Sequence, residues 1–476
     1  TVNGGKVVAC GYYSAAIGGG YGGAGGTVTI NGGTVSAWHA YNATDIGPGV
    51  YSSKGDAVTI NGGSVKAATI QNAPVNAGGK SLYCVTVKSP LQRDSCIVKG
   101  LNGDGMRSVR PIDGKAYLWL PNGEYEFTVD GCAVSATVAG GPVEAQTEEL
   151  RGYEFVEYIE STAGGHQYID TGYTHKSNTA VACSVSVASQ QGLSHPTVFG
   201  AFDSSFHSKA FVFFAKFGGA AKPAFCRTEN EQAGTEGSFP YGERVDLVCE
   251  GTQASWRKFG EASVCGSISN DRAKADDGGC AMNIFVINNN GAQPDNSWCV
   301  MKLYSFRIYE GDALVRDFAP CVDQTTGEAG LYDFVEGKFY GNDGTGAAFH
   351  PSLNVVVGAN FEANRTLKDG ETYKFVGDVD YTAAAGESAM TVERGASVVL
   401  EIPAGVTVTL RGGDAEGRTG AGAGIEVPPD ATLTVIGAGK LVAVGGKAAN
   451  GCDGGNAPLG WVRPNEDGSG EDCHGH

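Results

Sequence analysis

The chain has 476 residues, and 34 Lys plus Arg against 52 Asp plus Glu give it a formal net charge of −18 at pH 7. So acidic a chain repels phosphate backbones and anionic lipid, which argues against nucleic acid as a partner. No apolar run is long enough to predict membrane insertion. Solubility outside a cell explains the acidity. The alternative explanation of the acidity is that clusters of acidic side chains bind Ca²⁺. Calcium is therefore the candidate cofactor, and no cofactor is certain.

Residues 1–78 contain a glycine-rich repeat. A Thr-Val/Ile-Asn-Gly-Gly phrase occurs three times, with Asn3, Asn31 and Asn61 spaced 28 and then 30 residues apart. The stretch 17–20 recurs 29 residues later as 46–49. Short Val/Ile/Thr runs at this period, separated by glycine corners, are typical of a β-solenoid, which resembles a parallel β-helix.

Each repeat is expected to form one coil of short strands. Alternation in the run Thr27 to Ile30 points Val28 and Ile30 into the coil. Asn-Gly supplies the positive φ of a bend. Asparagines stacked at the same place in successive coils would form a hydrogen-bonded ladder along the axis.

Residues 352–450 follow the same logic and predict the start of a second β-solenoid. The stretch 401–410 aligns without a gap on 426–435, at an offset of 25 residues. A solenoid needs about three coils and capped ends for stability. We therefore expect the natural protein to continue in both directions. The Gly-rich end, residues 451–476, is expected to be disordered.

Residues 80–146 predict a small β-sandwich. A strand at 116–120 is followed by the turn Pro121-Asn122-Gly123 and a strand that places Tyr125, Phe127 and Val129 on one face. Trp119 is expected in the core rather than as a sugar platform. The stretch 120–129 resembles prealbumin-type modules, which implies a spacer.

Residues 153–349 alternate strand runs with polar turns and lack long helical periodicity, which favours a two-sheet jelly roll. Tyr304, Phe306 and Ile308 alternate with Ser305 and Arg307 as in a half-buried strand. Motifs recur at the two ends of this region, at 157–173 and at 302–346.

Those paired end motifs resemble the laminin-G-like, concanavalin-A-like jelly rolls of bacterial and phage surface proteins. The resemblance implies that the first and last strands lie in one sheet. It also implies binding of glycans or proteins, sometimes with calcium, and no catalysis. The terminal repeats resemble glycine-rich, adhesin-like repeats of bacterial cell-surface proteins. The resemblance therefore implies an all-β, extracellular or cell-surface protein.

Aromatic rings and amides in the divergent middle of this region are the candidate ligand residues, because sugars need stacking surfaces and bidentate hydroxyl contacts. They are Trp256, Trp298, Asn288, Asn289, Asn290 and Asp295. Five residues of the end motifs are expected to be structural, as strand-end ion pairs and turn formers. These are Asp170, Arg316, Asp317, Tyr332 and Asp333.

Known catalytic motifs are missing from the sequence, including Gly-x-Ser-x-Gly and His-Glu-x-x-His. A polysaccharide lyase is the enzymatic alternative, with Arg411, Asp414, Glu416 and Arg418 as the residues of suitable type. No Cys-x-x-Cys pair occurs among the 13 cysteines, and a disulfide between Cys249 and Cys265 is left open.

The sequence thus predicts a non-catalytic, secreted or cell-surface modular protein that binds glycans, or surface proteins of a host or neighbouring cell, through its jelly roll. Membership of a polysaccharide-degrading enzyme is the alternative, and a purely structural stalk is the third option.

Overall fold

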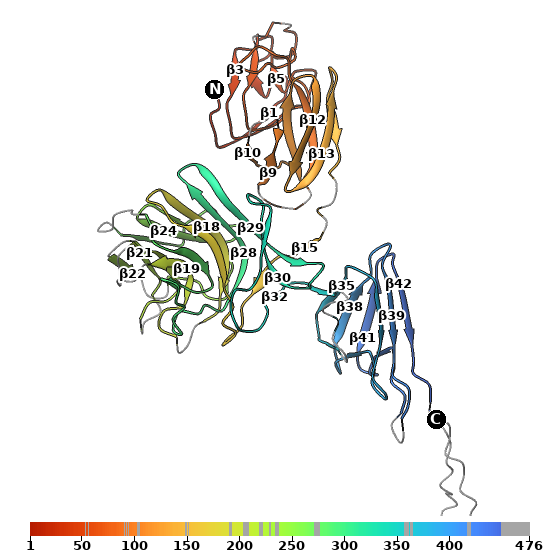
Figure 1. Cartoon of the computed structure of the whole chain (residues 1–476). Coiled ribbons are helices and arrows are strands. Elements are labelled where there is room, and N and C mark those ends of the chain that lie inside the picture. The colour runs from red at the N-terminus through yellow and green to blue at the C-terminus, as the bar shows by residue number, and fades with distance from the viewer. Residues whose placement is uncertain are drawn as a thin grey trace, which may run out of the picture. The chain divides into compact units, whose positions relative to one another are not determined.

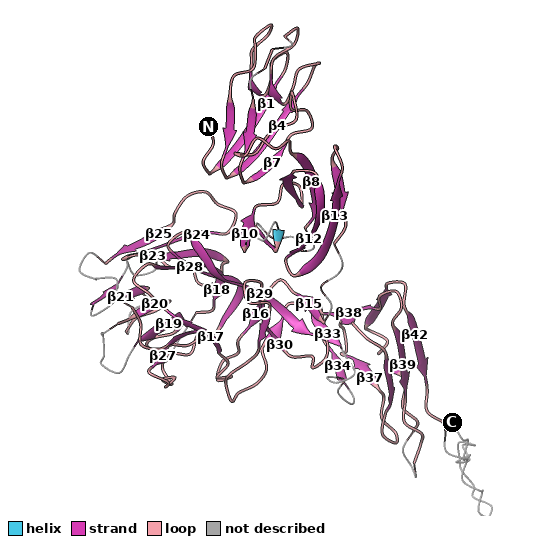
Figure 2. Ribbon diagram, turned by 45° about the horizontal axis from the view of Figure 1, so that its top comes forward, coloured by secondary structure: helices cyan, strands magenta, loops and turns pink. Residues whose placement is uncertain are grey.

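The computed structural model describes residues 1–448, apart from residues 53, 56, 90, 92, 94, 102–104, 148–149, 151, 190–192, 203–208, 219–221, 228–229, 234–237, 271–276, 357–360, 362–364 and 417–419. Every named element is a β-strand, so the predicted all-β class is confirmed. Figure 2 draws strands throughout the molecule, with a short helical turn beside them. The chain divides into two compact units. Unit 1 is Thr1–Arg151 with the short segments Ala313–Asp317 and Asp333–Lys338, and unit 2 is the remainder. The end at 451–476 lies outside the described residues.

Unit 1 begins with strands that pair in parallel at the repeat spacing (Figure 1). The sheets are β1 (Lys6–Gly11), β4 (Thr34–His39) and β7 (Ser64–Lys66); β2 (Ile17–Gly18) and β5 (Ile46–Gly47); and β3 (Val28–Ile30) and β6 (Val58–Ile60). The expected ladder is present, because Asn31 Nδ2 donates to Asn3 Oδ1 and Asn61 Nδ2 to Asn31 Oδ1, each at 2.8 Å. Ile30 is fully buried and Val28 packs beside it, as the alternation predicts.

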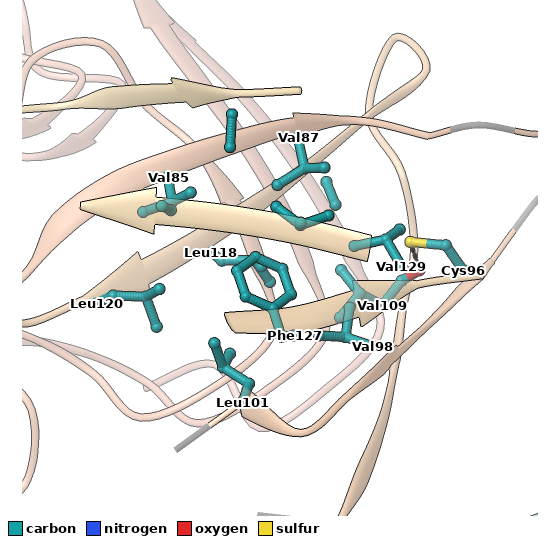
Figure 3. Packing of buried hydrophobic residues seen from close by; sticks show 14 of the residues in the cluster. Val85, Val87, Cys96, Val98, Leu101, Val109, Leu118, Leu120, Phe127 and Val129 are labelled. Atoms are coloured by element: carbon teal, nitrogen blue, oxygen red, sulfur yellow. Dashed lines mark hydrogen bonds between the residues drawn. The ribbon is translucent and has the colours of Figure 1, made fainter. Parts of the chain in front are cut away.

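Two antiparallel-rich sheets complete unit 1. Their strands are β10 (Met106–Val109), β9 (Cys96–Lys99), β12 (Gly123–Val129) and β13 (Cys132–Val138), facing β11 (Lys115–Leu120), β8 (Tyr83–Lys88) and β14 (Val143–Ala145). Figure 3 shows Phe127 and Val129 among the valines and leucines of the core between the sheets. Tyr125 packs against the same core, so the predicted common face of β12 is confirmed.

Two larger sheets form the central part of unit 2. The first has the order β25 (Gly266–Ser269), β24 (Gln253–Lys258), β23 (Val245–Glu250), β18 (Thr179–Val187), β28 (Met301–Glu310), β29 (Ala313–Asp323), β30 (Ala329–Asp333) and β31 (Lys338–Tyr340), joined by β15 (Tyr153–Phe155), β16 (Ile159–Glu160) and β32 (His350–Pro351). The second has the order β17 (Ile169–Thr174), β26 (Ala281–Ile284), β19 (Thr197–Phe202), β20 (Phe211–Phe214), β21 (Ala224–Arg227) and β22 (Asn230–Ala233), with β27 (Asn288–Asn289) on β19.

Phenylalanine rings fill the space between these two sheets. Phe306 of β28 contacts Phe199 of β19, with ring centroids 5.4 Å apart, and Phe318 of β29, at 6.3 Å. All three side chains are fully buried. The first strand of the region, β15, and its last, β31, belong to the same sheet, as the resemblance of the end motifs implies.

The C-terminal strands of unit 2 again pair in parallel. Their sheets are β33 (Asn354–Val356), β35 (Thr372–Phe375), β38 (Ser397–Glu401) and β41 (Thr432–Ile436); β34 (Arg365–Leu367), β37 (Met390–Val392) and β40 (Ile425–Glu426); and β36 (Val379–Thr382), β39 (Thr407–Arg411) and β42 (Lys440–Val444).

The 25-residue alignment predicted from the sequence is not the register of these C-terminal strands. Thr432 lies opposite Ser397, and Lys440 lies opposite Thr407. Thr407 and Thr432, which the alignment matched, belong to different sheets. The alignment failed because alternating Thr and Val residues suit every strand of a coil, whereas the long glycine-rich connection at 412–424 sets the true coil length.

The end motifs of the central region supply ion pairs and turns, as expected. Asp170 Oδ1 accepts a hydrogen bond from the Gly172 amide at 2.8 Å, which forms a turn. Asp317 pairs with Arg93 inside unit 1. The Tyr332 ring packs on another tyrosine in its own sheet.

Asp333 is the most constrained of these carboxylates. It is fully buried, and its Oδ1 accepts hydrogen bonds from the amides of Asp317 and Val335, both at 2.9 Å. Arg316 Nε lies 3.5 Å from Asp333 Oδ2, while Arg316 Nη2 lies 2.6 Å from Glu336 Oε1. Burial raises the pKa of Asp333, and the two amides and Arg316 offset only part of that rise.

We expect Asp333→Asn to become relatively more stable than the parent protein as pH rises. Because the folded pKa of Asp333 lies above its unfolded value, the favourable contribution of this group is full at low pH and is lost as pH rises through the folded pKa. The asparagine side chain cannot ionise, so the variant does not lose this stability. Its free energy of unfolding should therefore rise relative to that of the parent by on the order of 1 kcal/mol.

Urea unfolding of both proteins between about pH 4 and pH 7 measures the difference in free energy. Asp312→Asn, an exposed carboxylate nearby in the sequence, controls for removal of one charge. A difference that stays constant with pH, or shrinks as pH rises, would contradict the prediction.

The cysteines of the described residues are free, so the open alternative of a Cys249–Cys265 disulfide is wrong. Cys249 is buried between the sheets, whereas Cys265 is exposed. Burial raises the pKa of the Cys249 thiol well above its ordinary value and that of Cys96 to about 12. These thiols are therefore small core residues with little nucleophilic reactivity.

Candidate functional site

The second sheet of the central region is apolar on both of its faces. Strands β19, β20 and β21 read as nearly continuous hydrophobic runs, Thr-Val-Phe-Gly-Ala-Phe, Phe-Val-Phe-Phe and Ala-Phe-Cys-Arg, and are buried almost throughout. Phe199 and Phe213 face the other sheet, where they contact Phe306 and Trp256. The alternate residues therefore build a separate hydrophobic cluster on the opposite face.

That opposite face carries a cavity of about 360 Å³, which we call the aromatic pocket. A volume of this size suits a small ligand. Strands β19, β20 and β21 contribute Phe202, Phe214 and Cys226, strand β27 contributes Asn289, and connections between strands contribute the rest of the lining. The remaining lining residues are His195, Phe217, Ile287, Asn289, Pro294, Asn296 and Ser297.

Polar groups hold the rim of the aromatic pocket in place. Ser194 Oγ lies 2.8 Å from His195 Nδ1, and Asn296 Nδ2 donates to Ser194 Oγ at 3.0 Å and lies 3.2 Å from His195 Nδ1. The His195 ring meets Phe217 edge to face, with centroids 4.8 Å apart. The pocket thus combines aromatic rings with an exposed amide at its edge. Aromatic rings can stack on the apolar CH face of a sugar, and an amide can exchange hydrogen bonds with its hydroxyls.

The predicted asparagine run has three different environments. Asn288 is buried, donates from Nδ2 to the Ala281 carbonyl at 2.8 Å and accepts from the Gly291 amide at 2.7 Å, so it is structural. Asn289 is half-buried and lines the aromatic pocket. Asn290 is exposed with a left-handed φ of 49°. Asp295 is exposed on the same loop but is not part of the pocket lining.

Trp298 lies at a second cavity, of about 390 Å³. One face of its indole is stacked on His166, with centroids 4.7 Å apart and an interplanar angle of 15°. Its buried Nε1 has no hydrogen-bond partner within the described part of the chain. Gln167, also in the lining, is held by Thr162 and by the Ala348 carbonyl at 3.1 Å. With one face occupied, Trp298 offers less stacking surface than predicted.

Trp256 is a core residue, which corrects its prediction as a sugar-stacking ring. It is 1% exposed, its ring packs on Phe213 and Phe239, and its Nε1 donates to the Ser238 carbonyl at 3.0 Å. The alternation of β24 directs this side chain into the space between the sheets, where no ligand can reach it.

Unit 1 has a cavity of about 670 Å³ beside Trp119, with Asn61, Asn76 and Arg107 among its lining residues. The Trp119 ring packs on the coil core, and its Nε1 donates to the Val65 carbonyl at 2.9 Å. Trp119 is therefore structural, as expected. This cavity has one aromatic ring, whereas the aromatic pocket has three phenylalanine rings and a histidine.

Sequence reasoning missed His195, Phe214, Phe217 and Asn296. The signal for Phe214 was the run Phe211 to Phe214, in which consecutive apolar residues indicate a strand buried on both faces. The other three lie in connections, where no periodicity marks them.

No group of three or more His, Cys, Asp or Glu side chains is arranged to hold a metal ion in the part of the chain that the structure describes. Arg411 forms an ion pair with Asp380 on the neighbouring strand β36, and Asp414 accepts a hydrogen bond from the Lys447 amide at 2.8 Å. Arg418 lies outside the described residues.

No helix in the described ranges is long and apolar enough to cross a membrane.

Comparison with known proteins leaves the chain without an assigned family. No protein-family model matches the sequence, and no curated protein matches it. Among solved structures, a Bacteroides ovatus protein to which carbohydrate binding is ascribed is similar over 57% of this chain and 82% of its own, with 10% identity and a TM-score of 0.28. A likeness this weak assigns neither a fold nor a ligand to the present chain.

Proposed function

We propose that the chain is a non-catalytic, modular glycan-binding protein of the cell surface or the extracellular space, and that the aromatic pocket holds a sugar. The observation that carries the proposal is the pocket itself, in which Phe202, Phe214 and Phe217 surround about 360 Å³ beneath the Asn296 amide. Rings supply stacking area to the CH face of a pyranose, and amides donate to and accept from its hydroxyls.

Preorganisation of the rim supports this role. Asn296 is held by Ser194 and His195 before any ligand arrives, so little side-chain entropy remains to be lost on binding. The strands beneath, β19 and β20, are locked by paired backbone hydrogen bonds and by buried phenylalanines. Adhesion to glycans or proteins of a host or neighbouring cell would follow from display of this pocket.

A glycan array probed with the full chain, with and without a chelator, tests the proposal. We expect binding to a restricted set of glycans. Asn296→Ala and Phe217→Ala should each weaken it about fivefold, since each removes one polar or stacking contact worth roughly 1 kcal/mol. The chelator arm decides whether calcium takes part.

Asp295→Asn is the matched control, because this exposed residue lies on the same loop outside the pocket lining. Its binding should equal that of the parent protein. Thermal unfolding of each variant separates lost contacts from lost folding. An array without binding, or binding that survives Asn296→Ala and Phe217→Ala unchanged, would overturn the proposal.

A further inference from the structure

Five tyrosines form a continuous exposed row on the N-terminal coils of unit 1. Tyr12, Tyr13, Tyr21, Tyr41 and Tyr51 are 59%, 48%, 69%, 49% and 85% exposed. Neighbouring ring centroids are 4.8 Å apart for Tyr12 and Tyr41, 4.8 Å for Tyr12 and Tyr13, 6.3 Å for Tyr13 and Tyr21, and 5.6 Å for Tyr21 and Tyr51. We call this set the tyrosine row.

The coil repeat generates the tyrosine row. The Tyr41 amide donates to the Tyr12 carbonyl at 3.1 Å, so these residues occupy equivalent places in successive coils. Ile17 lies opposite Ile46, and the same register places Gly22 opposite Tyr51. The Gly22 amide donates to the Val50 carbonyl at 2.9 Å, which continues that register to the corner.

Tyr51 occupies a corner where its backbone is strained. Its φ is 62°, and the equivalent Gly22 has a φ of 67°. Left-handed backbone suits glycine and costs a bulky L-residue about 1–2 kcal/mol. The second coil thus carries a ring at a position where glycine is the unstrained choice. Strain of this kind at an exposed residue points to a role in binding rather than in stability.

The two segments that carry the row contain almost no charge, and exposed Lys54 follows just after them. Residues 11–26 and 40–53 contain a single charged side chain, Asp45, in a chain of net charge −18. Asp45 is 2% exposed. Its Oδ1 lies 2.7 Å from His39 Nδ1, and its Oδ2 accepts hydrogen bonds from the amides of Ala68 and Thr69 at 2.6 and 2.9 Å. An uncharged surface on an acidic protein suits an uncharged ligand.

The flanks of the row carry few side chains. Glycines surround it, in the stretches 18–20, 22–23 and 25–26. A protein partner would place its anchor side chains in pockets closed by neighbouring residues. Glycine flanks cannot form such walls. The rings meet edge to face, apart from the stacked pair Tyr13 and Tyr41, and together offer a line of exposed aromatic surface to a linear chain of apolar and hydroxyl-bearing units.

From these observations we infer that the tyrosine row binds an uncharged polysaccharide chain, at a site separate from the aromatic pocket. The phenol hydroxyls would exchange hydrogen bonds with the sugar hydroxyls at the row's edge while the rings stack on the sugar units.

Affinity electrophoresis of the full chain through gels that contain soluble neutral polysaccharides, namely mixed-linkage β-glucan, xyloglucan, galactomannan and arabinoxylan, tests the inference. Polygalacturonate serves as the charged comparison. We expect retardation by at least one neutral polymer and not by polygalacturonate. Tyr51→Gly should weaken that binding about tenfold, and Tyr41→Ala should add to the loss roughly multiplicatively.

Tyr51→Gly removes the ring without destabilising the fold, because glycine adopts the left-handed backbone without strain. Its unfolding temperature should be no lower than that of the parent protein. Tyr51→Phe keeps the ring and should retain most of the binding. Phe217→Ala, in the aromatic pocket, should leave the tyrosine-dependent retardation unchanged, so failure of one site is distinguishable from failure of the other.

Three results would overturn the inference. The first is no retardation by any of the neutral polymers. The second is retardation that Tyr51→Gly and Tyr41→Ala leave intact. The third is tyrosine-dependent self-association, seen in sedimentation, which would assign the row to a second copy of the chain.

Discussion

Gly18→Ala is expected to destabilise the N-terminal coils by about 2–4 kcal/mol. A Cβ at this position would lie 2.0 Å from the Gly47 carbonyl oxygen in the next coil, and the backbone φ is +138°. The two coils would have to separate, or the corner would have to refold. Either response removes the hydrogen bond from the Gly19 amide to the Gly47 carbonyl, now 2.8 Å long.

Hydrogen exchange at the Gly19 amide measures this effect directly, because local opening exposes it before the whole chain unfolds. Gly26→Ala is the matched control, since a Cβ there meets nothing within 4 Å. Protection of the Gly19 amide should fall in Gly18→Ala and persist in Gly26→Ala. Unchanged protection in Gly18→Ala would show that the added Cβ is accommodated with the Gly19–Gly47 hydrogen bond intact, which would contradict the prediction.

Phe306→Ala is expected to cost about 3–5 kcal/mol, because it empties a fully buried position between the two large sheets of unit 2. The ring touches Phe199 of the facing sheet and Phe318 of its own. Its removal leaves a cavity bordered by rigid rings, which cannot collapse far to fill it.

Urea unfolding of the parent protein, Phe306→Ala and Phe306→Leu tests this prediction, with leucine restoring part of the lost volume. We expect the leucine variant to lie between the other two. The transition of unit 1 should not shift, since Phe306 belongs to unit 2. A loss below about 1 kcal/mol for the alanine variant would mean that the core repacks around the vacant volume.

Local patterns in the sequence were enough to predict the strands and their inner faces. The period of Asn3, Asn31 and Asn61 predicted the asparagine ladder, and alternation in β12 predicted the face of Phe127. In each case the determining interaction repeats along the chain or lies within one strand.

Residues whose environment depends on distant segments could not be placed in this way. Trp256 and Trp298 look alike in sequence, yet one is buried between the sheets and the other is stacked on His166. Phe217 and Asn296 lie far apart in the chain and meet only because connections fold over the outer face of the second sheet.

The sequence by itself determined the all-β class, the repeat spacing at which the N-terminal strands pair in parallel, and which side of most strands is apolar, because period-two alternation acts within each strand. The tertiary structure alone decided the C-terminal register, the aromatic pocket and the tyrosine row. Those features arise where separate strands, connections and coils come into contact, and alternation carries no information about which contacts form.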